Sequence, residues 1–134
     1  MRMLALDWGT VRIGGAVSDP EGKFSFPLEK FIDSKNALAE IKQIISDLGV
    51  EKVLIGLPKG LAGQDTASTQ SAEVFIALLK SQLVQPVEIL DERFSSVAAG
   101  KTLASQGLSE KSQRDMKDNI AAQLMLQQYL DKKL

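Results

Sequence analysis

Acidic residues stand at the ends of two apolar runs in this chain. Asp7 directly follows the apolar residues 3–6, and Asp91 and Glu92 directly follow the run 86–90. If the two runs are parallel strands of one open sheet, their carboxyl ends meet at the same edge, where ligands usually bind. The sequence therefore predicts that carboxylates from distant parts of the chain lie beside one crevice.

A further carboxylate, Asp118, belongs to a predicted helix near the C-terminus. Its spacing to Ala121, Ala122 and Met125 places all four residues on one helical face. Two alanines let a helix backbone approach a sheet closely. We therefore expect this helix to carry Asp118 over the same crevice.

Carboxylates that converge repel one another unless a cation neutralises them, and hard oxygen ligands favour Mg²⁺ or Mn²⁺. One or two such ions, about 4 Å apart when there are two, lower the pKa of an attacking water and stabilise the leaving oxygen in displacement at phosphorus. The chain has no histidine and no cysteine. Serine-histidine triads, histidine-ligated zinc and thiolate nucleophiles are thereby excluded.

Each of these acids also has an ordinary structural interpretation. Asp7 taken alone is typical of a turn or a helix cap. Asp91 or Glu92 can pair with Arg93 at the surface, and Asp118 is a favourable acid in the first turn of a helix. The shared position at one sheet edge is what favours a metal site over these separate roles.

The composition predicts one globular domain, residues 1–134. Of the residues 44% are hydrophobic and 25% charged, and the net charge is -1, so binding of nucleic acid depends on a local basic patch rather than on a global field. The N-terminus lacks the pattern of a secretory signal, and no apolar run reaches membrane-spanning length. We expect a cytoplasmic protein that does not enter a membrane.

Periodicity predicts an α/β fold. Strands are expected over 3–6, 13–17, 23–31, 53–57 and 86–90, and helices over 37–48, 72–83, 95–106 and 115–132. The first three strands form an antiparallel meander, and the last two run parallel to the first. The prediction is a mixed five-stranded sheet flanked by helices.

Four separated motifs resemble those of the bacterial YqgF family, also called RuvX, the Holliday junction resolvases. The likeness runs from Met1 to the C-terminus, and its motifs are Asp7-Trp8-Gly9-Thr10-Val11-Arg12-Ile13-Gly14, Gly56-Leu57-Pro58, Asp91-Glu92-Arg93-Phe94-Ser95-Ser96 and Asp118-Asn119-Ile120-Ala121-Ala122.

The resemblance implies a ribonuclease H-like fold and a metal-dependent nuclease that matures the 5′ end of precursor 16S ribosomal RNA. It implies that Asp7, Glu92 and Asp118 are the catalytic carboxylates and bind Mg²⁺ or Mn²⁺. Arg12 and Arg93 match basic positions of the family motifs and are expected to bind substrate.

Two further residues complete the candidate substrate-binding set. Thr10 lies in the first motif, and Lys59 lies in a glycine-containing stretch, 56–63, whose backbone amides could approach a phosphate. The neighbouring Val11 stands where the family usually has a lysine, which removes one positive charge from the expected nucleic-acid face. Trp8, beside Asp7, either stacks on a base or fills the edge of the core, and we favour the core.

Other functions stay open at this point. Cleavage of four-way DNA junctions uses the same chemistry and requires a dimer, and we expect a monomer or a weak homodimer. A non-catalytic domain of the same fold, binding RNA or protein, is a second alternative. The Asp-x-Gly-Thr motif is also similar to the phosphate loop of actin-like ATPases, but those proteins need two lobes.

Overall fold

The computed structural model describes the backbone of residues 1–9, 11–57, 67–91 and 110–133, and the side chains of these ranges except 57, 67–69, 91, 110–118 and 133. One mixed sheet forms the centre of the molecule, with the strand order β3-β2-β1-β5-β6 and with β4 paired to β2. Its strands are β1 Met3–Asp7, β2 Arg12–Ser18, β3 Ser25–Pro27, β4 Ile32–Asp33, β5 Lys52–Leu57 and β6 Val87–Asp91.

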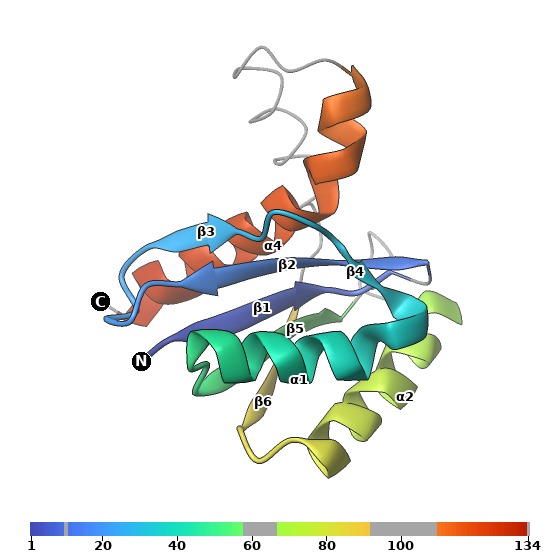
Figure 1. Ribbon diagram of the computed structural model, residues 1–134, viewed down its shortest axis with the longest axis horizontal. Helices are drawn as coiled ribbons and strands as arrows, with labels where there is room; N and C mark the ends of the chain where they lie inside the picture. Colours follow the sequence, from blue (N-terminus) through green and yellow to red (C-terminus); the bar gives the residue numbers. More distant parts are fainter. Residues whose placement is uncertain (10, 58–66, 92–109, 134) are drawn as a thin grey trace.

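Helices cover both faces of this sheet (Figure 1). The short 3₁₀ helix η1 Ser34–Asn36 leads into α1 Ala37–Leu48, which lies with α2 Ala67–Gln82 on one face, and α4 Glu110–Lys133 lies on the other. β5 is parallel to β1, and β6 is parallel to β5. These features confirm the predicted mixed α/β sheet flanked by helices.

The alternation of side chains along β1 assigns each residue to one of two cores. Leu4 and Leu6 join the core beneath α1 and α2, whereas Met3 and Ala5 join the core beneath α4. Strand residues two apart point to the same face. Asp7 therefore belongs to the face that α4 covers.

The third predicted strand, 23–31, is wrong as a single element. The structure divides it into β3 and β4, so the sheet has six strands rather than five. Pairing with β2 continues to Leu28, whose N–H donates to Gly15 O at 2.9 Å, but the carbonyl of Leu28 then accepts from Asn119 Nδ2 at 2.9 Å. Because α4 satisfies that carbonyl, the ladder stops, and it resumes only at Ile32.

Helix boundaries follow the prediction in part. α1 has the predicted bounds, and its stop is Gly49, which adopts a left-handed φ of 67° and donates to Ile45 O at 3.0 Å. α2 begins at Ala67 and α4 at Glu110, each about five residues before the predicted start, because the polar residues of their first turns show no apolar period. The helix predicted over 95–106 lies outside the described residues.

Amide side chains of α4 cover the outer edge of β3. Gln127 Oε1 accepts from Ser25 N at 2.9 Å, its Nε2 donates to Lys23 O at 3.2 Å, and Gln123 Nε2 donates to Ser25 O at 3.1 Å. An open edge strand otherwise invites pairing with another chain. The spacing of Asn119, Gln123 and Gln127 by four residues therefore closes the edge and fixes the position of α4.

Candidate functional site at the end of the central strand

Asp7 is the last residue of β1, a central strand of the sheet, and its exposed fraction is 8%. Along the sheet its partners are Gly14 on β2 and Gly56 on β5. Neither glycine has a side chain, so neither neighbouring strand places one against the Asp7 carboxylate. This carboxylate is buried, and its neighbours along the sheet on both sides are glycines.

The carboxyl ends of three strands meet at this edge. Asp7 is level with Gly56 on β5, Gly56 is level with Leu90 on β6, and Leu57 is level with Asp91. The predicted parallel arrangement of the strands that end at Asp7 and Asp91 is thereby confirmed. Glu92 lies outside the described residues, and the side chain of Asp91 is not described.

α4 crosses the same face of the sheet next to Asp7. Ala121 and Ala122 are almost completely buried, and Ala122 packs in one core with Ala5 and Ala16, as the prediction of a closely packed helix requires. The backbone of Asp118 is part of α4, although its side chain is outside the description. Within the described side chains no group of three metal-ligating residues is found, since two of the three predicted ligands are not among them.

Asn119 connects α4 to the strand beside Asp7. Its side chain is 1% exposed, and its Oδ1 accepts from Gly15 N at 2.8 Å while its Nδ2 donates to Leu28 O at 2.9 Å. Sequence reasoning passed over this residue. The signal was available, because Asn119, Gln123 and Gln127 repeat amide side chains on one helical face.

The connection between β1 and β2 is tight. A Cβ atom at Gly9 would collide with the carbonyl oxygen of Arg12, so this position requires glycine. Ser34 holds the connection from outside, its Oγ donating to Gly9 O at 3.0 Å and its N–H to Val11 O at 3.2 Å. Thr10, a predicted substrate-binding residue, lies outside the described residues.

Trp8 fills the edge of the core, as favoured from the sequence. It packs against the core beneath α1 and α2, with its ring centroid 4.8 Å from that of Phe75. Its indole N–H is buried without a hydrogen-bond partner. The side chain therefore supports the end of β1 rather than offering a surface for stacking.

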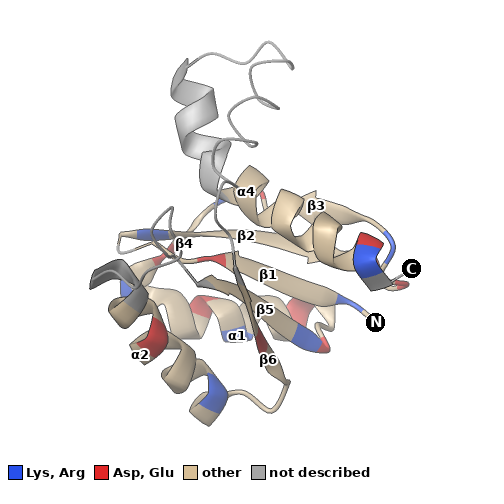
Figure 2. Ribbon diagram, turned by 180° about the vertical axis from the view of Figure 1, so that it is seen from behind, with Lys and Arg blue, Asp and Glu red and all other residues tan. Residues whose placement is uncertain are grey.

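Arg12 begins β2 and shares a strand face with Gly14 and Ala16, the face that α4 covers. Figure 2 shows β1 and β2 uncharged along their length and charged where β1 ends and β2 begins. The guanidinium carbon of Arg12 lies 5.3 Å from the ring centroid of Phe31. Arg93 and Lys59, the other predicted basic contacts, lie outside the described residues.

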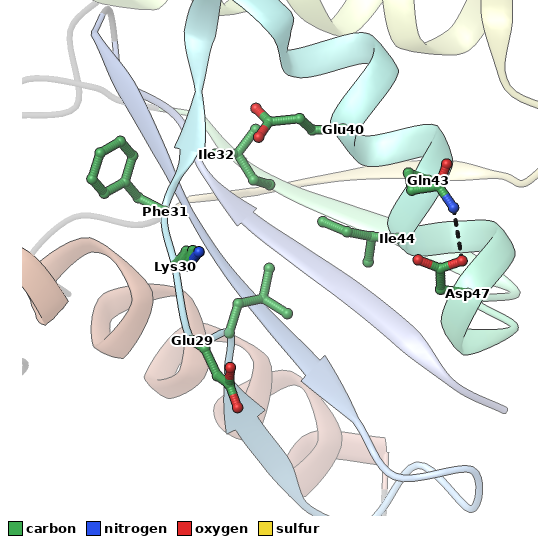
Figure 3. Close-up of a pocket in the computed structure, with 9 residues that line it drawn as sticks. Glu29, Lys30, Phe31, Ile32, Glu40, Gln43, Ile44 and Asp47 are labelled. Carbon is green, nitrogen blue, oxygen red and sulfur yellow. Dashed lines mark hydrogen bonds between the residues drawn. The ribbon is translucent and has the colours of Figure 1, made fainter.

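A groove of about 520 Å³ lies elsewhere, between the β3–β4 connection and α1 (Figure 3). Leu28, Ile32 and Ile44 form much of its apolar lining, and Glu40 and Asp47 line it from α1. Ile32 points toward α1 in Figure 3 and belongs to the core on that side of the sheet. The groove therefore lies beside α1, and residues 29–31 of the β3–β4 connection border it.

No described helix is long and apolar enough to cross a membrane.

The fold, with a buried carboxylate at the end of a central strand, is that of the junction-resolving nucleases. The structure of the Fowlpox virus resolvase with Holliday junction DNA matches it with a TM-score of 0.62 at 13% identity, covering 100% of this chain and 99% of the other. The structure of T. thermophilus RuvC with a Holliday junction substrate matches it with a TM-score of 0.58 at 14% identity, covering 99% and 95%.

The sequence matches the family described as RuvX, Holliday junction resolvase, over residues 1–132. The chain belongs to this family. A relative from Leifsonia xyli is 42% identical over 130 residues, covering 96% of this chain and 84% of its own length. One from Koribacter versatilis is 37% identical over 134 residues, covering 98% and 88%. Both carry the name "Putative pre-16S rRNA nuclease".

Proposed function

We propose that this protein is a metal-dependent nuclease that processes the 5′ end of precursor 16S ribosomal RNA. The observation that carries the proposal is Asp7, a buried carboxylate at the end of a central strand with glycine on both sides. The names of the relatives from Leifsonia and Koribacter supply the substrate.

The proposed metal ligands are Asp7, Glu92 and Asp118. Asp7 lies on the sheet face that α4 covers, and Asp118 is on α4 itself. On β6, Leu90 packs in the core beneath α4. Of the two acids that follow the apolar run 86–90, Glu92 is proposed as the third ligand on the family resemblance.

These residues fit a hard divalent cation, since all three donors are carboxylate oxygens. A bound Mg²⁺ or Mn²⁺ would activate water and stabilise the leaving oxygen of a phosphodiester. Burial of Asp7 limits the water that competes for its oxygens. Arg12, on the same face, is proposed to bind a phosphate of the substrate, together with Arg93, Thr10 and Lys59.

Cleavage of four-way DNA junctions is the second candidate, because the family description and the two similar solved structures name Holliday junctions. The same carboxylates would serve both substrates, since the choice depends on surface shape and on contacts to the 2′-OH. A symmetric cut requires two active sites. Sedimentation with and without a junction therefore separates a monomeric RNA-processing enzyme from a dimeric resolvase.

The test incubates the purified protein with precursor 16S RNA and, separately, with a four-way DNA junction, in Mg²⁺ or Mn²⁺. Asp7→Asn is compared with Asp47→Asn, a matched control on the exposed side of α1 that keeps an acceptor for Gln43. We expect RNA cleavage by the wild type and the control but not by Asp7→Asn. Junction cleavage alone would favour the resolvase, and cleavage of neither would favour a non-catalytic binding domain.

A further inference from the structure

The interruption between β3 and β4 forms a bulge opposite β2, the strand that pairs with β1 at Asp7. Leu28 pairs with Gly15 and Ile32 pairs with Ile13, so the three residues 29–31 oppose the single residue Gly14. Bulges of this kind re-aim side chains and often lie beside functional sites. Here the bulge changes the direction of the chain before Phe31.

The bulge lies level with Asp7 across the strands of the sheet. Gly14 pairs with Asp7 on one side and faces residues 29–31 on the other. Neighbouring strands are about 4.8 Å apart, so two strand spacings separate the backbone of the bulge from that of Asp7 by roughly 10 Å. At 3.4 Å per nucleotide in a stacked strand, this span is about three nucleotides or fewer.

Phe31 is exposed at this position. Its exposed fraction is 43%, and Figure 3 shows it pointing away from α1 while its neighbour Ile32 points toward that helix. Arg12, whose guanidinium lies 5.3 Å from the Phe31 ring centroid, occupies a β2 position on the same face as Gly14. Phe31 also borders the groove beside α1, and it contacts a cation that begins β2, the strand paired with β1 at Asp7.

Charged residues of both signs surround Phe31. Arg12, Lys30 and Lys35 lie in or beside the bulge, and so do the acids Glu29, Asp33 and Glu40, whose carboxylate accepts from Asp33 N at 2.9 Å. The Asp33 carboxylate accepts a hydrogen bond from Lys35 N at 2.9 Å as the cap of η1. By contrast Phe24 and Phe26, on or beside β3, are more exposed at 61% and 53%, and no cation–π contact joins them to a described residue.

We propose that Phe31, held by Arg12, is a stacking site for an unpaired nucleobase of the substrate, three nucleotides or fewer from the scissile phosphate beside Asp7. The ring accepts the face of any base, and Arg12 and Lys30 supply positive charge for the adjoining backbone. The inference rests on the proposed function in taking nucleic acid as the ligand and Asp7 as the position of cleavage. If Phe31 stacks on an unpaired base, the substrate must have an unpaired segment near the cleavage position.

The test measures binding rather than cleavage. Fluorescence anisotropy in EDTA would follow a labelled short single-stranded RNA, the same RNA with abasic sites, and its fully paired duplex. Stacking of one base on an aromatic ring gives an expected loss of about 10-fold in affinity for Phe31→Ala on the single strand. Phe31→Trp is expected to keep or increase the affinity, and Phe26→Ala to leave it unchanged.

The abasic RNA separates stacking from damage to the fold. We expect wild type and Phe31→Ala to bind it equally, since no base is present to stack. The proposal is overturned if Phe31→Ala binds the normal single strand like wild type, if its loss persists on abasic RNA, or if the wild type does not bind single-stranded RNA. EDTA removes the metal ions that the proposed cleavage requires, so this assay measures binding alone. The cleavage assay with Asp7→Asn can therefore fail while the binding assay succeeds, and the binding assay can fail while the cleavage assay succeeds.

Discussion

The side chain of Asn119 accepts a hydrogen bond of 2.8 Å from the backbone N–H of Gly15, 104 residues earlier in the chain. Gly15 follows Gly14, the partner of Asp7 on β2, and Asn119 follows Asp118 on α4. This single amide therefore joins α4, which carries Asp118, to β2, the strand paired with β1 at Asp7. A second bond, from Asn119 Nδ2 to Leu28 O, joins the same amide to the start of the bulge.

Replacement of Asn119 by leucine is expected to leave the buried Gly15 N–H and the part-buried Leu28 carbonyl without their partners. The free energy of unfolding should fall by about 2–4 kcal/mol, since each unsatisfied group costs about 1–3 kcal/mol. Cleavage by the folded fraction should fall as well, in kcat more than in KM, because α4 loses its fixed position. Gln128→Leu, at an exposed position of the same helix, is the control and should change neither quantity.

The two glycines beside Asp7 are expected to affect metal binding. A methyl group in Gly14→Ala or Gly56→Ala would lie level with Asp7 on the neighbouring strand and should weaken Mn²⁺ binding. Gly15→Ala provides the contrast, because its Cβ would collide with the Leu28 side chain on the opposite face. That variant should lose thermal stability and keep its Mn²⁺ affinity in the folded state, as calorimetry can measure.

Lys52 ties the other end of the sheet to α4. Its ammonium donates to the Tyr129 hydroxyl at 2.8 Å and lies 3.4 Å from Glu88, and the hydrogen bond to Tyr129 raises the pKa of Lys52 above 10.5. A raised pKa gives stability that is fully present below 10.5 and is lost as the pH rises through the folded-state pKa. Lys52→Met should therefore lower the free energy of unfolding by about 1 kcal/mol at neutral pH.

Denaturant unfolding of Lys52→Met and wild type across the alkaline range checks this prediction. The difference between the two proteins should shrink above pH 10.5. A difference that stays constant with pH would show that the charge of Lys52 contributes nothing. Since Lys52 begins β5 and Asp7 ends β1, cleavage at neutral pH should be unaffected by the substitution.

The strands that position Asp7 could be predicted from the sequence because their apolar runs are short and uninterrupted. A parallel strand buried on both faces leaves that pattern, and a carboxylate directly after such a run stands out. Ala121 and Ala122 likewise indicated a closely packed helix. The assignment of Asp7, Glu92 and Asp118 as ligands, and of one domain over residues 1–134, stays a prediction.

The bulge at residues 29–31 could not be predicted from the sequence. The segment 23–31 reads as one mixed strand, and its interruption depends on a hydrogen bond from Asn119, 91 residues after Leu28. The local sequence pattern cannot indicate a hydrogen-bond partner that is so distant along the chain.

The central claim is that Asp7, Glu92 and Asp118 share a divalent ion, and equilibrium titration with Mn²⁺ tests it most directly. Loss of an outer partner of a metal ligand already weakens binding roughly 10- to 100-fold. Asp7→Asn, Glu92→Gln and Asp118→Asn should therefore each weaken Mn²⁺ binding by at least roughly 10-fold, while Asp47→Asn binds like wild type. Equal affinity in all five proteins, or no binding by the wild type, would contradict the account.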